Sequence, residues 1–256
     1  MSGRPSSVPV RLRREWAGVT ILAGASAAVG SLLLSEWWTT SHGRTWLLIA
    51  GGLAAAELVL LRQWLHDNRP TDAAKLRTTL GVANGLTVLR GLLVAAVAGF
   101  LPLATPSGGG LWVPTALYAG AVVLDYADGF FARRLGEVTA LGRRLDEAMD
   151  TVGLFVAPTL AVAYGQLPSW YLLVPLAKPL YVASLRAYRR LVAGELQPLP
   201  ESSLRRGLAA LQMSLTAVAL SPPVGPPVTT VLAAVGVVPF VGMFARDWLA
   251  VTGVRR

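Results

Sequence analysis

Residues 125–150 read DYADGFFARRLGEVTALGRRLDEAMD and contain four aspartates, two glutamates and four arginines. Six of the 14 acidic residues in a chain of 256 therefore lie in this one stretch. Apolar runs flank it on both sides, LWVPTALYAGAVVL before it and TVGLFVAPTLAVAYG after it. Because ionisable residues at membrane depth are costly and by default functional, this stretch guides the interpretation of the whole chain.

The composition is that of an integral membrane protein. Hydrophobic residues make up 54% of the chain and charged residues only 14%, against about 25% charged in an average globular domain. The net charge of +9 fits basic residues at the ends of membrane helices, so we expect membrane lipid and no nucleic acid as a partner. The chain has no cysteine, which excludes disulfides and thiolate metal sites.

Apolar runs long enough to form membrane helices recur along the chain. A helix needs roughly 20 mostly apolar residues to cross a bilayer, and the run at 111–124 is too short unless its helix continues to about Arg133. We therefore predict an all-α, polytopic membrane protein in which the acidic stretch begins on a helix. Its eight transmembrane helices are expected near residues 17–35, 46–61, 86–104, 111–124, 151–166, 168–185, 207–221 and 227–245.

The distribution of Lys and Arg predicts the orientation, because cytoplasmic loops carry the excess of both. With both termini inside, Arg44 is the only Lys or Arg in the connections that fall outside. We expect a multi-pass protein of the cytoplasmic (inner) membrane, with residues 125–150 at its cytoplasmic edge. Residues 1–66 are predicted to form an arm and an accessory hairpin, and residues 67–256 a six-helix catalytic core.

Helical spacing brings the four aspartates of the stretch together. Positions three or four apart share a helix face, which groups Asp125 with Asp128 and Asp146 with Asp150. Four carboxylates in one volume repel one another unless cations offset their charge. Oxygen ligands suit Mg²⁺, Mn²⁺ or Ca²⁺, and four carboxylates suit two such ions about 4 Å apart.

Small residues lie beside these carboxylates. Gly129, Ala132 and Gly142 leave the helix backbone bare, so that a flat or bulky group can approach it closely. Arg133 is next to this face and can meet a phosphate oxygen. Since Mg²⁺ typically binds through one or two carboxylates together with substrate phosphates, a nucleotide phosphate is the expected ligand.

The spacing resembles the signature of the CDP-alcohol phosphotransferases, D-x2-D-G-x2-A-R-x8-G-x3-D-x3-D. The chain matches each of its eight fixed positions from Asp125 to Asp150. The upstream stretch ANGLTVLRGLL also resembles the first core helix of that family, in which an Asn, a Thr and an Arg recur at the spacing of Asn84, Thr87 and Arg90. The usual Pro before that Asn is Ala83 here. The resemblance covers about residues 80–250 and leaves the first two helices without a role.

The resemblance implies a membrane-embedded, usually homodimeric enzyme that passes a substituted phosphate from a CDP-linked donor to an alcohol and releases CMP. It implies two divalent ions, Mg²⁺ or Mn²⁺, and Asp150 as the general base. The implied metal ligands are Asp125, Asp128, Asp146 and Asp150. The implied lining of the CDP pocket is Asn84, Thr87, Gly129, Ala132, Arg133 and Gly142.

Three alternatives stay open at the level of sequence. The donor is expected to be CDP-diacylglycerol, but a CDP-amino alcohol that donates to diacylglycerol would use the same residues. A phosphorylated acceptor would need further cations, for which Lys178, Arg186, Arg189 and Arg190 are candidates. A cation transporter would also place acids in membrane helices, although transport sites tend to lie near the bilayer midplane.

Overall fold

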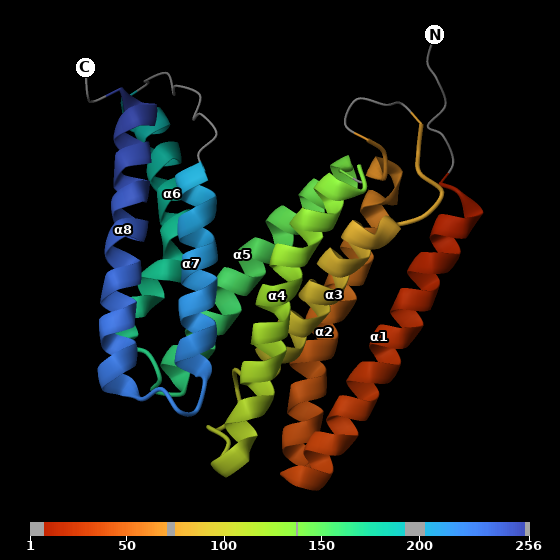
Figure 1. Cartoon of the computed structure of the whole chain (residues 1–256), viewed down its shortest axis with the longest axis horizontal. Helices are drawn as coiled ribbons and strands as arrows, with labels where there is room; N and C mark the ends of the chain where they lie inside the picture. The colour runs from red at the N-terminus through yellow and green to blue at the C-terminus, as the bar shows by residue number, and fades with distance from the viewer. Residues whose placement is uncertain (1–7, 71–74, 137, 193–202, 254–256) are drawn as a thin grey trace. The chain divides into compact units, whose positions relative to one another are not determined.

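A computed structural model describes residues 8–70, 75–136, 138–192 and 203–253, apart from the side chains of Arg133, Ser203 and Arg206. Within these ranges the chain forms α-helices and three short 3-10 turns, with no β-strand (Figure 1). The all-α prediction is therefore confirmed. The helices are α1 (Val10–Trp37), α2 (Thr40–Trp64), α3 (Gly81–Ala98), α4 (Trp112–Arg134), α5 (Ala140–Ala163), α6 (Leu173–Val192), α7 (Ser203–Leu220) and α8 (Pro226–Thr252).

Each of the eight expected membrane helices corresponds to one of these, and two boundaries are informative. Helix α4 runs on to Arg134, so the prediction that it carries the start of the acidic stretch is confirmed. Helix α3 begins earlier than expected and ends at Ala98, not at residue 104. The chain turns there because the N–H of Leu101 bonds to the carbonyl of Ala98, and Pro102 has no N–H with which to continue a helix.

Four helical segments of the described chain are long and apolar enough to cross a membrane. They are Val10–Trp37, Thr40–Asp67, Gly81–Ala98 and Pro226–Thr252. Many of their large apolar side chains are exposed, for example Leu22, Leu48 and Val238, which is the expected state of side chains that face lipid. The chain is thus a polytopic membrane protein.

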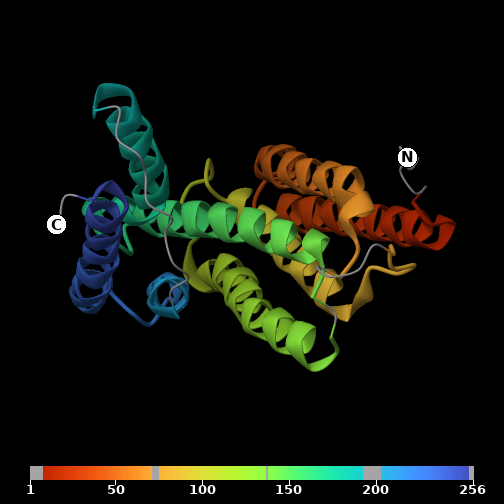
Figure 2. The ribbon, with the colours of Figure 1, turned by 90° about the horizontal axis from the view of Figure 1, so that it is seen from above.

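The chain divides into two compact units, Met1–Gly153 and Leu154–Arg256. In the first unit α1 packs on α2, α2 on α3, and α3 on α4, and Figure 2 shows α1 and α2 side by side from above. In the second unit α6 and α7 both pack on α8. Its interior holds a polar contact in which the Tyr171 hydroxyl donates to Oε1 of Gln212 at 2.7 Å.

Local sequence signals fix the turn that carries the acidic stretch from α4 to α5. Gly136, with φ of 61°, adopts a left-handed conformation that glycine tolerates at little cost. Thr139 then precedes α5, and its hydroxyl accepts a hydrogen bond from the N–H of Gly142 at 3.0 Å, which is an N-cap. The carbonyl of Arg69 accepts from the N–H of Ala140 at 3.0 Å, so the segment after α2 holds this turn in place.

Candidate active site

Arg90 of α3 lies at the centre of the acidic cluster. Its Nη1 donates to Oδ1 of Asp125 and, at 2.9 Å, to Oδ1 of Asp150. Its Nη2 donates to Oδ1 of Asp146 at 2.8 Å and to the backbone carbonyl of the same residue at 3.3 Å. The Arg90 side chain is almost fully buried, so one guanidinium joins three carboxylates from two helices.

The fourth aspartate, Asp128, is held by a different residue of α3. Its Oδ2 accepts a hydrogen bond from the Thr87 hydroxyl at 2.9 Å, and its side chain is buried. Carboxylate oxygens of Asp125, Asp128 and Asp146 lie within 4.8 Å of one another. The four aspartates that the spacing groups in pairs are thus brought to one place, where α4 and α5 both face α3.

This arrangement fits a divalent cation. Three carboxylate oxygens within 4.8 Å of one another form an all-oxygen donor set, the kind that Mg²⁺ and Mn²⁺ prefer. The single positive charge of Arg90 is smaller than the charge of four ionised carboxylates. Asp146 and Asp150 are also 50% and 43% exposed at their side chains, so ions and substrate have access from one side.

A group of buried polar side chains lies beside the cluster. Nδ2 of Asn84 donates to the Leu80 carbonyl at 2.8 Å, to Oδ1 of Asn68 at 3.2 Å and to the Thr139 hydroxyl at 3.2 Å. A Cβ added to Gly142 would lie 2.5 Å from Oδ1 of Asn84. Gly142 therefore lets α5 approach Asn84, and Asn84 occupies the space that the missing side chain leaves.

The remaining pocket candidates are on α4, one to two turns beyond Asp125. Gly129 and Ala132 are partly exposed and lie on the same helix as the buried Asp128. Arg133 is within α4, but its side chain is outside the part of the chain that the structure describes. The acceptor candidates Lys178, Arg186, Arg189 and Arg190 are exposed residues of α6, in the second unit, and their role stays a prediction.

Sequence reasoning missed three residues near this site. Arg90 was noted in the upstream motif but was given no role, although it contacts three aspartates. Asn68, which is fully buried and bonds to Asn84, lies outside both motifs. Glu57 of α2 is 3% exposed with no hydrogen-bond partner for either carboxylate oxygen, and a Cβ on Gly91 would lie 2.3 Å from its Oε1.

A signal for Glu57 was present in the sequence. It is the only charged residue in the expected span 46–61, and an acid inside a membrane helix is a functional candidate by default. Asn68 carries no such signal, because a single Asn in a linker is ordinary.

The fold and the cluster together define a class of protein, a helical membrane protein with a cluster of aspartates contributed by two of its helices. The family model for CDP-alcohol phosphatidyltransferase matches residues 80–242, more than half of the chain. The chain belongs to the CDP-alcohol phosphatidyltransferase family.

Curated relatives match parts of the same region. A protein of Bacillus subtilis (strain 168) named CDP-diacylglycerol--glycerol-3-phosphate 3-phosphatidyltransferase is 31% identical over 80 residues, 29% of this chain and 42% of the relative. A protein of the same name from Pectobacterium atrosepticum is 32% identical over 85 residues, 30% of this chain and 46% of the relative. A Mycobacterium tuberculosis (strain ATCC 25618 / H37Rv) relative named for cardiolipin synthesis is 33% identical over 104 residues, 41% of this chain and 48% of the relative.

The chain thus spans somewhat less than half the length of these relatives. No solved structure matches it significantly.

Proposed function

We propose that this chain is a transferase of phospholipid synthesis that moves a substituted phosphate from CDP-diacylglycerol to the hydroxyl of an alcohol and releases CMP. The observation that carries the proposal is the convergence of four motif aspartates from α4 and α5 around Arg90 and Thr87 of α3. Membership of the CDP-alcohol phosphatidyltransferase family and the names of two relatives support the same donor.

The reaction is a displacement at phosphorus. The acceptor oxygen attacks the β-phosphorus of the donor, the bond from that phosphorus to the bridging oxygen breaks, and CMP leaves with that oxygen. Asp150 takes the proton of the hydroxyl. Its side chain is 43% exposed while its Oδ1 is fixed by Arg90, so it is both accessible and oriented.

Divalent ions complete the proposed site. Asp125, Asp128, Asp146 and Asp150 would hold two Mg²⁺ or Mn²⁺ ions, which offset the negative charge of the pyrophosphate when bound. Thr87 keeps the Asp128 carboxylate in one orientation through its 2.9 Å hydrogen bond. Asn84, Gly129, Ala132, Arg133 and Gly142, together with Thr87, are proposed to line the nucleotide pocket.

Orientation and assembly belong to the same proposal. We propose that the aspartates face the cytoplasm at the membrane edge, with both termini on that side, because Lys and Arg concentrate in the connections of that side. A lipid donor then keeps its acyl chains in the bilayer while a soluble acceptor reaches the site from water. A homodimer, with residues 67–256 as its catalytic core, follows from the family resemblance.

Purified protein with Mg²⁺ or Mn²⁺ tests the proposal directly. CDP-diacylglycerol is offered with glycerol 3-phosphate, other alcohols and a phospholipid acceptor in turn, and CMP release and the lipid product are measured. Asp128→Asn should abolish turnover, whereas Glu147→Gln, the same change at an exposed acid outside the signature, should retain it. Turnover with CDP-ethanolamine and diacylglycerol, but none with CDP-diacylglycerol, would reverse the donor assignment.

A further inference from the structure

A buried acid of the N-terminal hairpin reaches the helix that carries Arg90. Glu57 of α2 is 3% exposed, and in the part of the chain that the structure describes neither of its carboxylate oxygens has a hydrogen-bond partner. A Cβ added to Gly91 of α3 would overlap both Oε1 of Glu57 and Sδ of Met149. The carboxyl group therefore lies where α2, α3 and α5 meet, beside the residues that follow Arg90 and precede Asp150.

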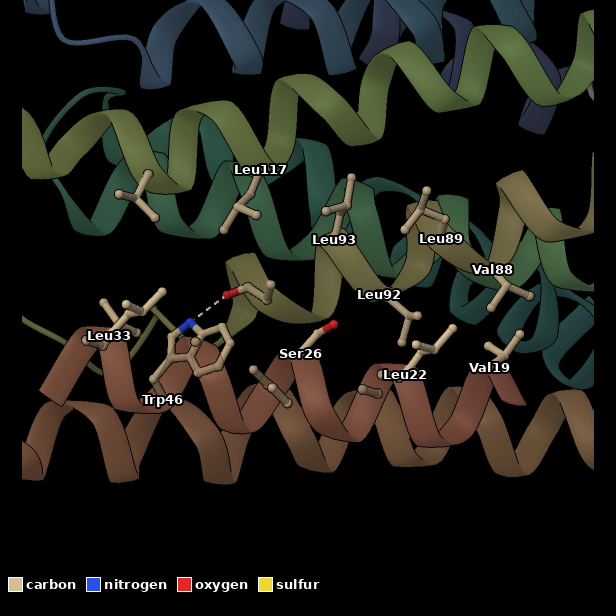
Figure 3. Close-up of a pocket in the computed structure, with 18 of the residues that line it drawn as sticks. Val19, Leu22, Ser26, Leu33, Trp46, Val88, Leu89, Leu92, Leu93 and Leu117 are labelled. Carbon is tan, nitrogen blue, oxygen red and sulfur yellow. Dashed lines mark hydrogen bonds between the residues drawn. The ribbon is translucent and has the colours of Figure 1, made fainter. Parts of the chain in front are cut away.

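The packing of α2 against α3 holds this carboxyl group in place. Trp46 of α2 donates its indole N–H to the carbonyl of Ala96 in α3 at 2.9 Å (Figure 3), and a Cβ added to Gly99 would overlap the indole ring. Glu57 follows Trp46 by 11 residues, about three turns, and therefore lies on the same side of α2. Glu57 does not line the apolar cavity of about 760 Å³ that α1, α2, α3 and α4 border (Figure 3), so an occupant of that cavity is no partner for it.

Arg90 has one hydrogen-bond donor that the aspartates do not use. Its Nη1 and Nη2 bond to carboxylates of the cluster, whereas its Nε is buried and has no acceptor among the described residues. The charges of Arg90 and Glu57 are near enough to attract each other. An unsatisfied buried donor and two unsatisfied buried acceptors thus lie on neighbouring helices, and such groups in a folded protein call for an explanation.

The charge balance of the proposed ion site supplies that explanation. Four ionised aspartates and two divalent ions carry equal and opposite charge, so the aspartates cannot balance the charge of Arg90 as well once both ions are bound. A buried charge is costly unless it is paired. Glu57 is a fifth carboxyl group next to α3, and both of its oxygens are free to accept a hydrogen bond.

We propose that Glu57 is a positioning residue that supplies the counter-charge of Arg90 when divalent ions occupy the aspartates. The inference rests on the proposed function, because it is the two ions of that function that take over the carboxylates. It gives the N-terminal hairpin, which lies outside the matched family region, a role in the active site. A buried acid that costs stability is then retained because ion binding needs it.

Calorimetric titration of the purified full chain with Mn²⁺ tests this role. Glu57→Gln removes the charge and keeps the size of the side chain, so its affinity for Mn²⁺ should be roughly 5- to 150-fold lower than that of the parent protein, the usual range for coupling between two sites. Glu57→Asp keeps the charge and should bind Mn²⁺ more tightly than Glu57→Gln. The control is Glu36→Gln, the same change at an exposed acid of α1, which should bind Mn²⁺ as the parent does.

Thermal unfolding without divalent ions separates this role from a structural one. A carboxyl group that has no partner does not stabilise the fold, so the Tm of Glu57→Gln should not be lower than that of the parent protein. Weaker Mn²⁺ binding together with a lower Tm would make Glu57 a structural residue and would refute the proposal.

A double-mutant cycle shows whether Glu57 acts through Arg90. In an Arg90→Met background, Glu57→Gln should change the Mn²⁺ affinity less than it does in the parent protein, because the charge that Glu57 balances is gone. An undiminished effect would show that Glu57 acts on the ions directly and would overturn its assignment to Arg90.

The same titration distinguishes this inference from the proposed function. If the parent protein and Glu57→Gln bind Mn²⁺ equally well, the role of Glu57 is wrong and the proposed function stands. If the parent protein binds neither Mn²⁺ nor Mg²⁺, the ion site itself is wrong, and both the proposed function and this inference fail with it.

Discussion

A single methyl group at Gly142 tests the contact between α5 and Asn84. In Gly142→Ala the new Cβ would lie 2.5 Å from Oδ1 of Asn84 and 3.3 Å from the hydroxyl oxygen of Thr139. The first distance is roughly 1 Å shorter than an ordinary contact between carbon and oxygen. Either Asn84 or the first turn of α5 has to move.

Asn84 cannot move without breaking hydrogen bonds. It is buried, and its Nδ2 donates to Leu80, Asn68 and Thr139. Overpacking of this kind costs about 1–3 kcal/mol, and each neutral hydrogen bond that breaks costs about 1 kcal/mol more. Alanine returns up to about 1 kcal/mol through its higher helix propensity. We therefore expect Gly142→Ala to lower the free energy of unfolding by about 1–3 kcal/mol.

The control is Gly153→Ala on the same helix. A Cβ at Gly153 would lie 3.7 Å from Cγ2 of Val94, an ordinary contact, so this variant gains helix propensity without a clash. Thermal unfolding in detergent, followed by tryptophan fluorescence, should show a lower Tm for Gly142→Ala and an equal or higher Tm for Gly153→Ala. If the whole of this cost falls on the nucleotide pocket, KM for CDP-diacylglycerol rises roughly 5- to 150-fold, and a smaller share raises it less. Equal Tm and KM in both variants would refute the close approach of Gly142 to Asn84.

Three further variants probe the same region. Arg90→Met leaves three carboxylates without their buried cation, so we expect the free energy of unfolding to fall by on the order of 3 kcal/mol. Mg²⁺ should partly restore it. If Mg²⁺ raises the Tm of the variant no more than that of the parent protein, this expectation is wrong. Glu57→Leu removes a buried carboxyl group that has no hydrogen-bond partner, and should therefore raise the free energy of unfolding by about 1–2 kcal/mol. A Tm below that of the parent protein would show that Glu57 has a partner. Thr87→Val leaves Oδ2 of Asp128 without its hydrogen-bond donor. The affinity for Mn²⁺, measured by calorimetric titration, should fall roughly fivefold, which corresponds to about 1 kcal/mol. Thr87→Ser should bind Mn²⁺ as the parent protein does, and equal affinity in the parent and both variants would show that Thr87 does not position Asp128.

The sequence by itself determined the helical membrane fold and the grouping of the aspartates. Both follow from short-range physics. An apolar run of about 20 residues becomes a helix in lipid whatever surrounds it, and a spacing of three or four places two side chains on one helix face. Asp125 with Asp128, and Asp146 with Asp150, could therefore be paired before any coordinates were known.

Only the tertiary structure decided what fills the space between those pairs. Arg90 is 35 residues from Asp125 and 60 from Asp150 along the chain, and Glu57 and Asn68 come from the hairpin and the segment after it. Nothing in local spacing relates such positions, because their proximity depends on which face of α2 and α3 is turned inward. No motif encodes the apolar cavity lined by residues of α1, α2, α3 and α4 either, since a cavity is the space that several helices leave between them.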